Sequence, residues 1–131
     1  MMGTDPRREY LKQEVMTASP AELVAMLYGA CVKNLKLAAM AYEESKDICT
    51  TNNCLLKAQQ IISELMNCLD MNVELSTQLI KVYEFILMEL QIANIKKDLG
   101  RLEPIISMLE SMRDTWQSVA KQQRRSMTEG Y

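Results

Sequence analysis

Apolar residues recur along this chain at intervals of three and four positions, the spacing of one face of an α-helix. Four segments carry the pattern. In the first, from residue 19 to about 44, the apolar positions are Leu23, Met26, Leu27, Ala30, Leu37 and Ala41. The second segment, after residues 50–53, carries Leu55, Ala58, Ile62, Leu65 and Leu69. The pattern therefore predicts two helices in about the first half of the chain.

The second half of the chain repeats the pattern twice. The third segment, about 73–97, carries Leu75, Leu79, Val82, Ile86, Leu90 and Ala93. The fourth segment carries Ile105, Leu109, Met112, Trp116 and Val119. Four helices of this length with short connections are typical of an antiparallel bundle.

Polar and turn-forming residues mark the expected ends of these helices. Ser19, Pro20 and Glu22 fit an N-cap, a first helical position and the third residue of a capping box. Residues 50–53 indicate a break and a second cap, residues 70–72 a turn, and residues 98–100 another break. Pro104 leaves the start of the fourth helix open, because proline is tolerated only in a first turn.

We therefore predict an all-α fold, an antiparallel up-down four-helix bundle over residues 19–122. Residues 1–18 are mostly polar and too short to be a stable helix alone. We expect them to form a flexible, lid-like segment docked on the bundle. Periodicity is lost after residue 122, so residues 123–131 are expected to be a flexible tail.

The third predicted helix has a second apolar line. Phe85, Met88, Ile92 and Ile95 fall roughly opposite its core stripe. Monomers rarely leave such a line in water. It could be covered by the chain's own N-terminal segment or by a central position of this helix, by a second copy in a homodimer, or by a partner peptide. The pattern leaves these open, and they overlap because a docked tail can be displaced.

The composition argues against catalysis. The chain has no histidine and only four glycines, and its carboxylates form no recognisable acid–base pair. Its four cysteines, at positions 31, 49, 54 and 68, match no C-x-x-C or zinc spacing. We expect a binding protein that is not an enzyme, with no cofactor, no metal site and free thiols.

The charge pattern narrows the class of partner. The net charge is -2, and no basic surface is indicated, so nucleic acid is not expected as a ligand. No apolar run reaches the ~18–20 residues that span a bilayer, so no membrane is expected either. The N-terminus lacks the apolar middle of a signal peptide, which predicts a cytoplasmic protein.

Four short motifs occur in order over roughly residues 10–120. A tyrosine, Tyr10, precedes Thr17-Ala18-Ser19-Pro20, which is followed by Leu23, Met26, Leu27 and Tyr28. The others are Lys57-Ala58-Gln59 with Ile61, Ile62, Glu64, Leu65 and Leu69; Ala93-Asn94-Ile95-Lys96-Lys97-Asp98; and Met112-Arg113-Asp114-Thr115-Trp116. In these motifs the chain resembles the FliS family of flagellin export chaperones.

The resemblance implies a function and a partner. FliS proteins are four-helix bundles that bind the disordered C-terminal region of newly made flagellin, prevent its polymerisation in the cytosol and help present it to the type III export machinery. In the family an N-terminal tyrosine, here Tyr10, covers part of the groove and moves when flagellin binds. We therefore expect a partner-binding site made by Tyr10, Phe85, Met88, Ile92, Asn94 and Ile95.

Other positions on the third and fourth helices have plainer interpretations. Tyr83 and Trp116 lie on or near the core stripes, so packing is expected for both. Asn94 either binds a partner backbone or bonds a neighbouring helix.

The chain also departs from the family pattern. Gly29 and Ala30 follow the tyrosine where Asp or Asn and Gly are usual, and Asn34 replaces an aromatic residue. Tyr83-Glu84-Phe85-Ile86 stands for Y-D-Y-M, Met88 and Glu89 stand where two basic residues are common, and Pro104 is unusual. Two alternatives stay open: a diverged cargo, and a helical adaptor that homodimerises through the outer face of the third helix, a state also expected without cargo.

Overall fold

The computed structural model describes residues 19–129 of the chain, and the side chains of residues 19–126. It contains four long helices: α2 Pro20–Ser45, α3 Ile48–Asn67, α4 Glu74–Lys96 and α5 Leu102–Glu129. A 3-10 turn, η1 Leu99–Arg101, precedes α5. No strand occurs in the part of the chain that is described. The predicted all-α fold is confirmed.

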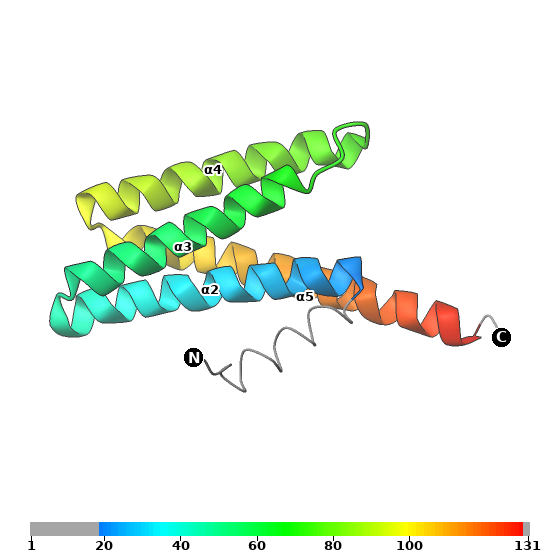
Figure 1. The fold of residues 1–131 in the computed structure, drawn as a ribbon, viewed down its shortest axis with the longest axis horizontal. Coiled ribbons are helices and arrows are strands. Elements are labelled where there is room, and N and C mark those ends of the chain that lie inside the picture. The colour runs from blue at the N-terminus through cyan, green and yellow to red at the C-terminus, as the bar shows by residue number, and fades with distance from the viewer. Residues whose placement is uncertain (1–18, 130–131) are drawn as a thin grey trace, which may run out of the picture.

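The helices pack in the order α4, α3, α2, α5 (Figure 1). Helix α2 lies between α3 and α5 and packs extensively on both. Helix α4 packs mainly on α3 and only slightly on α5, beyond its contact with η1. One of the sequence interpretations, a central third helix, is therefore wrong: the central helix is α2, and α4 lies at the edge.

Helix α2 begins as its capping sequence predicts. Ser19 is the N-cap, its Oγ accepts a hydrogen bond from the Glu22 backbone N–H at 3.2 Å, and Pro20 occupies the first turn. The Glu22 carboxylate forms an ion pair with Arg124 of α5, in place of the expected bond back to Ser19. The side chain that was expected to complete a local cap thus ties two helices together.

Helix α3 begins earlier than the sequence indicates. Residues 50–53 lie inside the helix and do not form a break. The cap is Asp47, whose Oδ1 accepts from the Thr50 N–H at 3.0 Å and whose Oδ2 accepts from the Thr50 hydroxyl at 2.6 Å. These hydrogen bonds lower the pKa of the Asp47 carboxyl. Thr51 is fully buried, and its hydroxyl donates to the Asp47 carbonyl at 2.7 Å, so a polar residue enters the core without a lost bond.

The ends of α4 and α5 agree only partly with expectation. Helix α4 starts and stops within one residue of its predicted bounds. Pro104 falls in the first turn of α5, where its missing N–H costs no helical hydrogen bond. Helix α5 continues to Glu129, past the point at which periodicity is lost. The flexibility of residues 123–131 stays a prediction, and the docking of residues 1–18 concerns residues outside those described.

The core stripe of α3 is confirmed from Leu55 to Leu65, and that of α5 is buried at Ile105 and Leu109 and half-buried farther on, whereas the stripe of α2 was assigned to the wrong side. In α2, Leu37 is 42% exposed and Leu23, Met26, Leu27, Ala30 and Ala41 are half-buried. A helix between two neighbours packs closely where its side chains are small, which explains the three buried alanines. The residues that α2 buries are Ala21, Ala25, Tyr28, Cys31, Val32, Leu35 and Ala38.

Helix α2 is also long and apolar enough to cross a membrane by length and composition, the one such helix among the described residues. The uncharged run within it, from Leu23 to Val32, stays shorter than ~18 residues, so the helix is weak evidence for a membrane span. The apolar composition has a structural cause, because α2 contacts two helices and needs apolar side chains on both sides.

Lys46 and Lys97 end their helices with a left-handed backbone conformation. Replacing each by glycine should have different effects on the free energy of unfolding. Lys46 (φ 51°) lies exposed above the Tyr42 ring, whereas Lys97 (φ 52°) donates from Nζ to the Asn52 and Asn94 Oδ1 atoms at 2.5 and 2.7 Å. Lys46→Gly should raise the free energy of unfolding by about 0.5–1 kcal/mol, because glycine adopts this conformation without a Cβ clash. Lys97→Gly should not, since it removes those bonds. Urea denaturation compares the two, and an equal gain from both would contradict this account.

Candidate partner-binding surface

The outer face of α4 carries the second apolar line predicted from the sequence. Phe85 is 45% exposed, Met88 49% and Ile95 83%, while Ile92 is half-buried. On the opposite side of the same helix, Ile86, Leu90 and Ala93 are fully buried. We call Phe85, Met88, Ile92 and Ile95 the α4 outer face. Its three exposed members remain open to solvent among the residues that the structure describes.

The inner side of α4 is not uniform along its length. Leu75, assigned to the core stripe, is 57% exposed in the first turn, and Leu79 and Val82 are half-buried. This first turn lies next to the α3–α4 connection at one end of the molecule, beyond the main core (Figure 1). The apolar pattern runs one turn farther than the core that it faces.

Asn94 is engaged within the chain. Its side-chain Oδ1 and its backbone carbonyl both accept from the Lys97 Nζ, at 2.7 and 2.6 Å, and the same ammonium reaches Asn52 of α3. Asn94 therefore bonds the end of its own helix, and Lys97 rather than Asn94 makes the contact with α3. A contact between Asn94 and a partner stays a prediction. Tyr10 lies outside the described residues.

Charged side chains fix the end of α4 beside this face. Arg101 of η1 forms an ion pair with Glu89 at 3.1 Å and another with Asp98 at 3.2 Å. The Glu89 side chain is only 18% exposed, so this pair is better shielded from water than an ordinary surface pair. Together with Lys97 it holds the carboxyl end of α4 against η1 and α3.

A buried tyrosine pair joins α4 to α2. The Tyr28 and Tyr83 hydroxyls are hydrogen-bonded to each other, the ring centroids are 6.4 Å apart, and both side chains are almost wholly buried. Burial raises the pKa of both phenols. The packing roles expected for Tyr83 and Trp116 are confirmed. The hydroxyl pair was not predicted, because Tyr28 was not on the core stripe expected for the first helix.

The cysteines divide by burial and form no disulfide. Cys31 and Cys54 are buried, while Cys49 and Cys68 are exposed. No group of three His, Cys, Asp or Glu side chains within residues 19–126 could hold a metal ion. Cys31 contacts the Ala58 carbonyl through its sulfur at 3.7 Å, and burial raises the pKa of its thiol from 9.0 to about 12. A neutral thiol of this kind packs as a small apolar group.

The raised pKa of Cys31 predicts weaker folding in alkaline solution. The unfolded thiol loses its proton above pH 9.0, whereas the folded thiol keeps it until about pH 12, so stability is complete below the lower value and falls as pH rises. The urea midpoint of the wild type should therefore drop as the pH rises above about 9. Cys31→Ala should have a flatter profile over that range, and an identical slope in both proteins would contradict this assignment.

The sequence of this chain is similar to those of several known proteins. Residues 3–123 match the sequence model of the family described as flagellar protein FliS. The flagellar secretion chaperone FliS of Bacillus subtilis is 38% identical over 121 residues, covering 92% of this chain and 90% of the relative. The chaperones of the same name from Salmonella typhimurium and Vibrio cholerae are each 26% identical, over 84% and 81% of this chain and 83% and 79% of their own lengths. The chain therefore belongs to the FliS family of flagellar secretion chaperones, and it is a binding protein rather than an enzyme.

Proposed function

We propose that this protein binds the C-terminal segment of flagellin in the cytoplasm, prevents its premature polymerisation and assists its delivery to the flagellar export apparatus. The observation that carries the proposal is the α4 outer face, an apolar line on a helix whose opposite side already forms the core. Membership of a family of flagellar secretion chaperones supports a flagellar protein as cargo.

The proposed site consists of Tyr10, Phe85, Met88, Ile92, Asn94 and Ile95. Binding a disordered segment costs conformational entropy, so the cargo must bury a large apolar surface in return. Phe85 and Ile95 are ten residues apart on α4, and that interval spans about 15 Å along the helix. One amphipathic stretch of cargo can lie along this length with its apolar side inward, while the remainder wraps other faces.

The position of α4 suits this task. The helix lies at the edge of the bundle, so its outer side is reachable by a long chain without opening the core. The buried Tyr28–Tyr83 pair and the Arg101–Glu89 ion pair hold it in place. A surface fixed in advance loses less entropy on binding than one that must first be ordered.

A second candidate function uses the same face. Exposed apolar residues in a line also favour self-association, so a homodimer through the α4 outer face is the alternative state in the absence of cargo. This alternative predicts dimers in which the Ile95 side chains of both copies become buried.

Calorimetry with the C-terminal ~40–60 residues of the organism's own flagellin tests the proposal, because coupled folding and binding gives a large negative heat-capacity change. We expect one cargo segment per chaperone. No heat of binding, together with a dimer that persists at all cargo concentrations, would reject the chaperone function and favour the adaptor. Ile92→Asp, the half-buried member of the face, should weaken binding by more than about tenfold while the helical circular dichroism is retained.

A further inference from the structure

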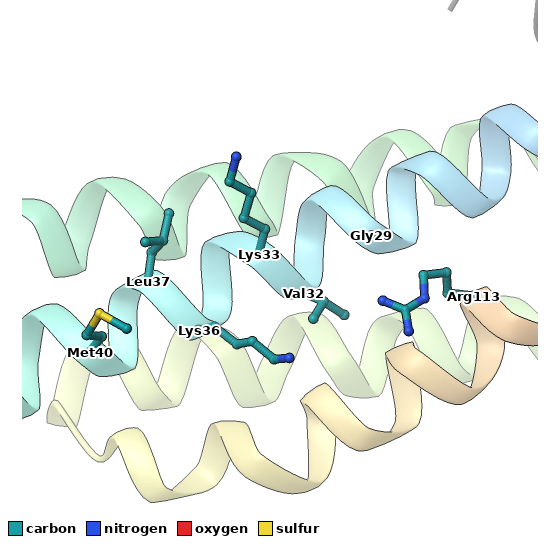
Figure 2. Close-up of a pocket in the computed structure, with 7 residues that line it drawn as sticks. All are labelled: Gly29, Val32, Lys33, Lys36, Leu37, Met40 and Arg113. Atoms are coloured by element: carbon teal, nitrogen blue, oxygen red, sulfur yellow. The ribbon is translucent and has the colours of Figure 1, made fainter.

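A second surface lies on the other side of the molecule, between α2 and α5. Six of its seven lining residues belong to α2 and one, Arg113, to α5 (Figure 2). It is an open groove with a volume of about 310 Å³. The lining residues are Gly29, Val32, Lys33, Lys36, Leu37, Met40 and Arg113. We call it the α2–α5 groove.

The groove has an apolar part. Val32 is buried, while Leu37 is 42% exposed and Met40 51% exposed on the outer side of α2. Gly29 lies beside Arg113 at the amino end of the groove, where a Cβ would make ordinary van der Waals contact with the Arg113 Cδ at 3.7 Å. From Gly29 to Met40 the helix rises about 16 Å, which is the length of three helical turns.

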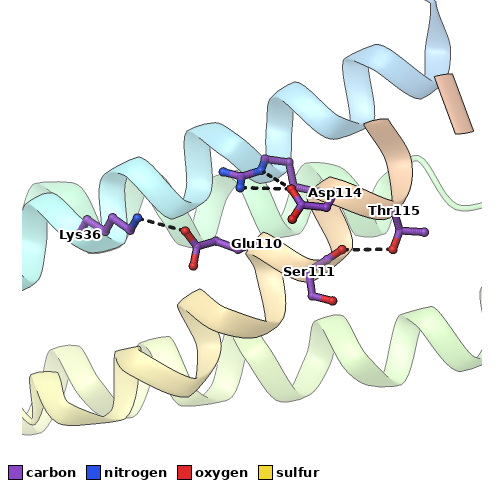
Figure 3. Close-up of polar contacts among 6 residues, drawn as sticks. Lys36, Glu110, Ser111, Asp114 and Thr115 are labelled. Atoms are coloured by element: carbon purple, nitrogen blue, oxygen red, sulfur yellow. Dashed lines mark hydrogen bonds and ion pairs between the residues drawn. The ribbon is translucent and has the colours of Figure 1, made fainter. Parts of the chain in front are cut away.

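The charged side chains that line the groove are all positive. Three of its seven residues are cations, none is acidic, and the chain as a whole has a net charge of -2. Lys36 forms an ion pair with Glu110 at 3.1 Å, and Arg113 with its neighbour Asp114 at 3.2 Å (Figure 3). Lys33 is exposed and forms no ion pair with any residue that the structure describes. Surface pairs of this kind contribute little and exchange readily for a better-placed carboxylate.

We propose that the α2–α5 groove is a docking site for an acidic, amphipathic helix of a protein partner other than the cargo. Its apolar side chains, at helical spacing, pack against Leu37 and Met40, and its carboxylates pair with the cations that line the groove. Three cations around a narrow apolar groove suit a helix better than an anionic membrane, whose flat surface is bound by larger basic clusters. Because the groove lies on α2 and α5, a partner there leaves the α4 outer face accessible.

The probe is a fluorescein-labelled synthetic helix of about 14 residues with leucines at positions i, i+3 and i+7 and flanking glutamates. Its matched control replaces every glutamate by glutamine. Fluorescence anisotropy should show that the acidic helix binds, that the glutamine helix binds at least about tenfold more weakly, and that added salt weakens the acidic helix. Equal affinity of the two helices would overturn the proposal.

Substitutions locate the binding. Lys33→Glu should weaken the acidic helix about tenfold, and Lys57→Glu, an equally exposed change on α3, should not. Equal weakening by both would mean non-specific charge attraction and would overturn the site.

The same titration in the presence of saturating flagellin C-terminal segment should give an unchanged affinity. Displacement by that segment would make the groove part of the cargo surface, and a self-associated protein that Lys33→Glu dissociates would assign the groove to a second copy.

Discussion

Phe85→Asp combined with Ile95→Asp should weaken the binding of the flagellin C-terminal segment by at least about a hundredfold. The two substitutions place a carboxylate at each end of a surface that the cargo must desolvate, and an unpaired charge in such a place costs several kcal/mol. Both side chains are substantially exposed in the free protein, Ile95 at 83%. The fold should therefore tolerate the changes, and the loss should be specific to binding.

A matched control comes from the same helix. Leu75 is 57% exposed in the first turn of α4, away from the outer face, so Leu75→Asp has similar chemistry and similar exposure. It should leave the affinity within about threefold of the wild type. Equal losses in Leu75→Asp and in the double variant would mean that binding depends on α4 as a whole and would contradict a site on its outer face.

Tyr28→Phe should be among the most destabilising changes that remove a single oxygen atom. The Tyr28 hydroxyl is hydrogen-bonded to the Tyr83 hydroxyl inside the core, so its removal leaves the buried Tyr83 hydroxyl without that partner. We expect a loss of about 1–3 kcal/mol from Tyr28→Phe and a loss in the same range from Tyr83→Phe, because each leaves the other hydroxyl buried without its partner. Urea denaturation followed by circular dichroism measures both.

The double variant Tyr28→Phe/Tyr83→Phe separates the contribution of the hydrogen bond from that of packing. With both hydroxyls absent, no phenol is left unsatisfied, so the combined loss should be smaller than the sum of the two single losses. Tyr42→Phe serves as the control, since Tyr42 is half-buried and its hydroxyl makes no hydrogen bond with any described residue; it should change stability by less than about 0.5 kcal/mol. Strictly additive losses from Tyr28→Phe and Tyr83→Phe would show that the hydroxyl pair contributes nothing.

The pair also connects stability to function. Helix α4 has little contact with α5, so its place relative to α2 depends on few interactions beyond its packing on α3. Tyr28 and Tyr83 make one of them directly, from the central helix to the edge helix. We therefore expect Tyr83→Phe to raise the amide exchange rate of α4 more than that of α2, because the variant loosens α4 selectively.

Helical periodicity was enough to predict the fold. Leu55, Ala58, Ile62 and Leu65 repeat at helical spacing, and all four are buried. The same reasoning failed on α2, since large apolar residues are conspicuous in a sequence whereas the helix packs on its alanines, with Leu37 left exposed. It also failed at the start of α3, because a run of threonine and asparagine resembles a loop until Asp47 is recognised as the cap.

The candidate site was predictable in position but not in detail. A second apolar line on one helix reveals a surplus face, and the exposure of Phe85, Met88 and Ile95 agrees with that prediction. Periodicity cannot show that Asn94 is engaged by Lys97, because the left-handed turn that brings the ammonium back depends on tertiary packing. The α2–α5 groove was missed for a related reason: Arg113 is far in sequence from Lys33 and Lys36 and joins them only when α2 and α5 pack.

The most direct test of the central claim is photocrosslinking from the α4 outer face. Met88→p-benzoylphenylalanine places the reactive group on a half-exposed position of that face, and Leu37→p-benzoylphenylalanine places it in the α2–α5 groove at a similar exposure. Each protein is irradiated with full-length monomeric flagellin, and mass spectrometry identifies the crosslinked peptides. The account predicts a crosslink from position 88 to the C-terminal region of flagellin and none from position 37. Crosslinks from position 37 alone, or from position 88 to a second copy of the chaperone in place of flagellin, would contradict it.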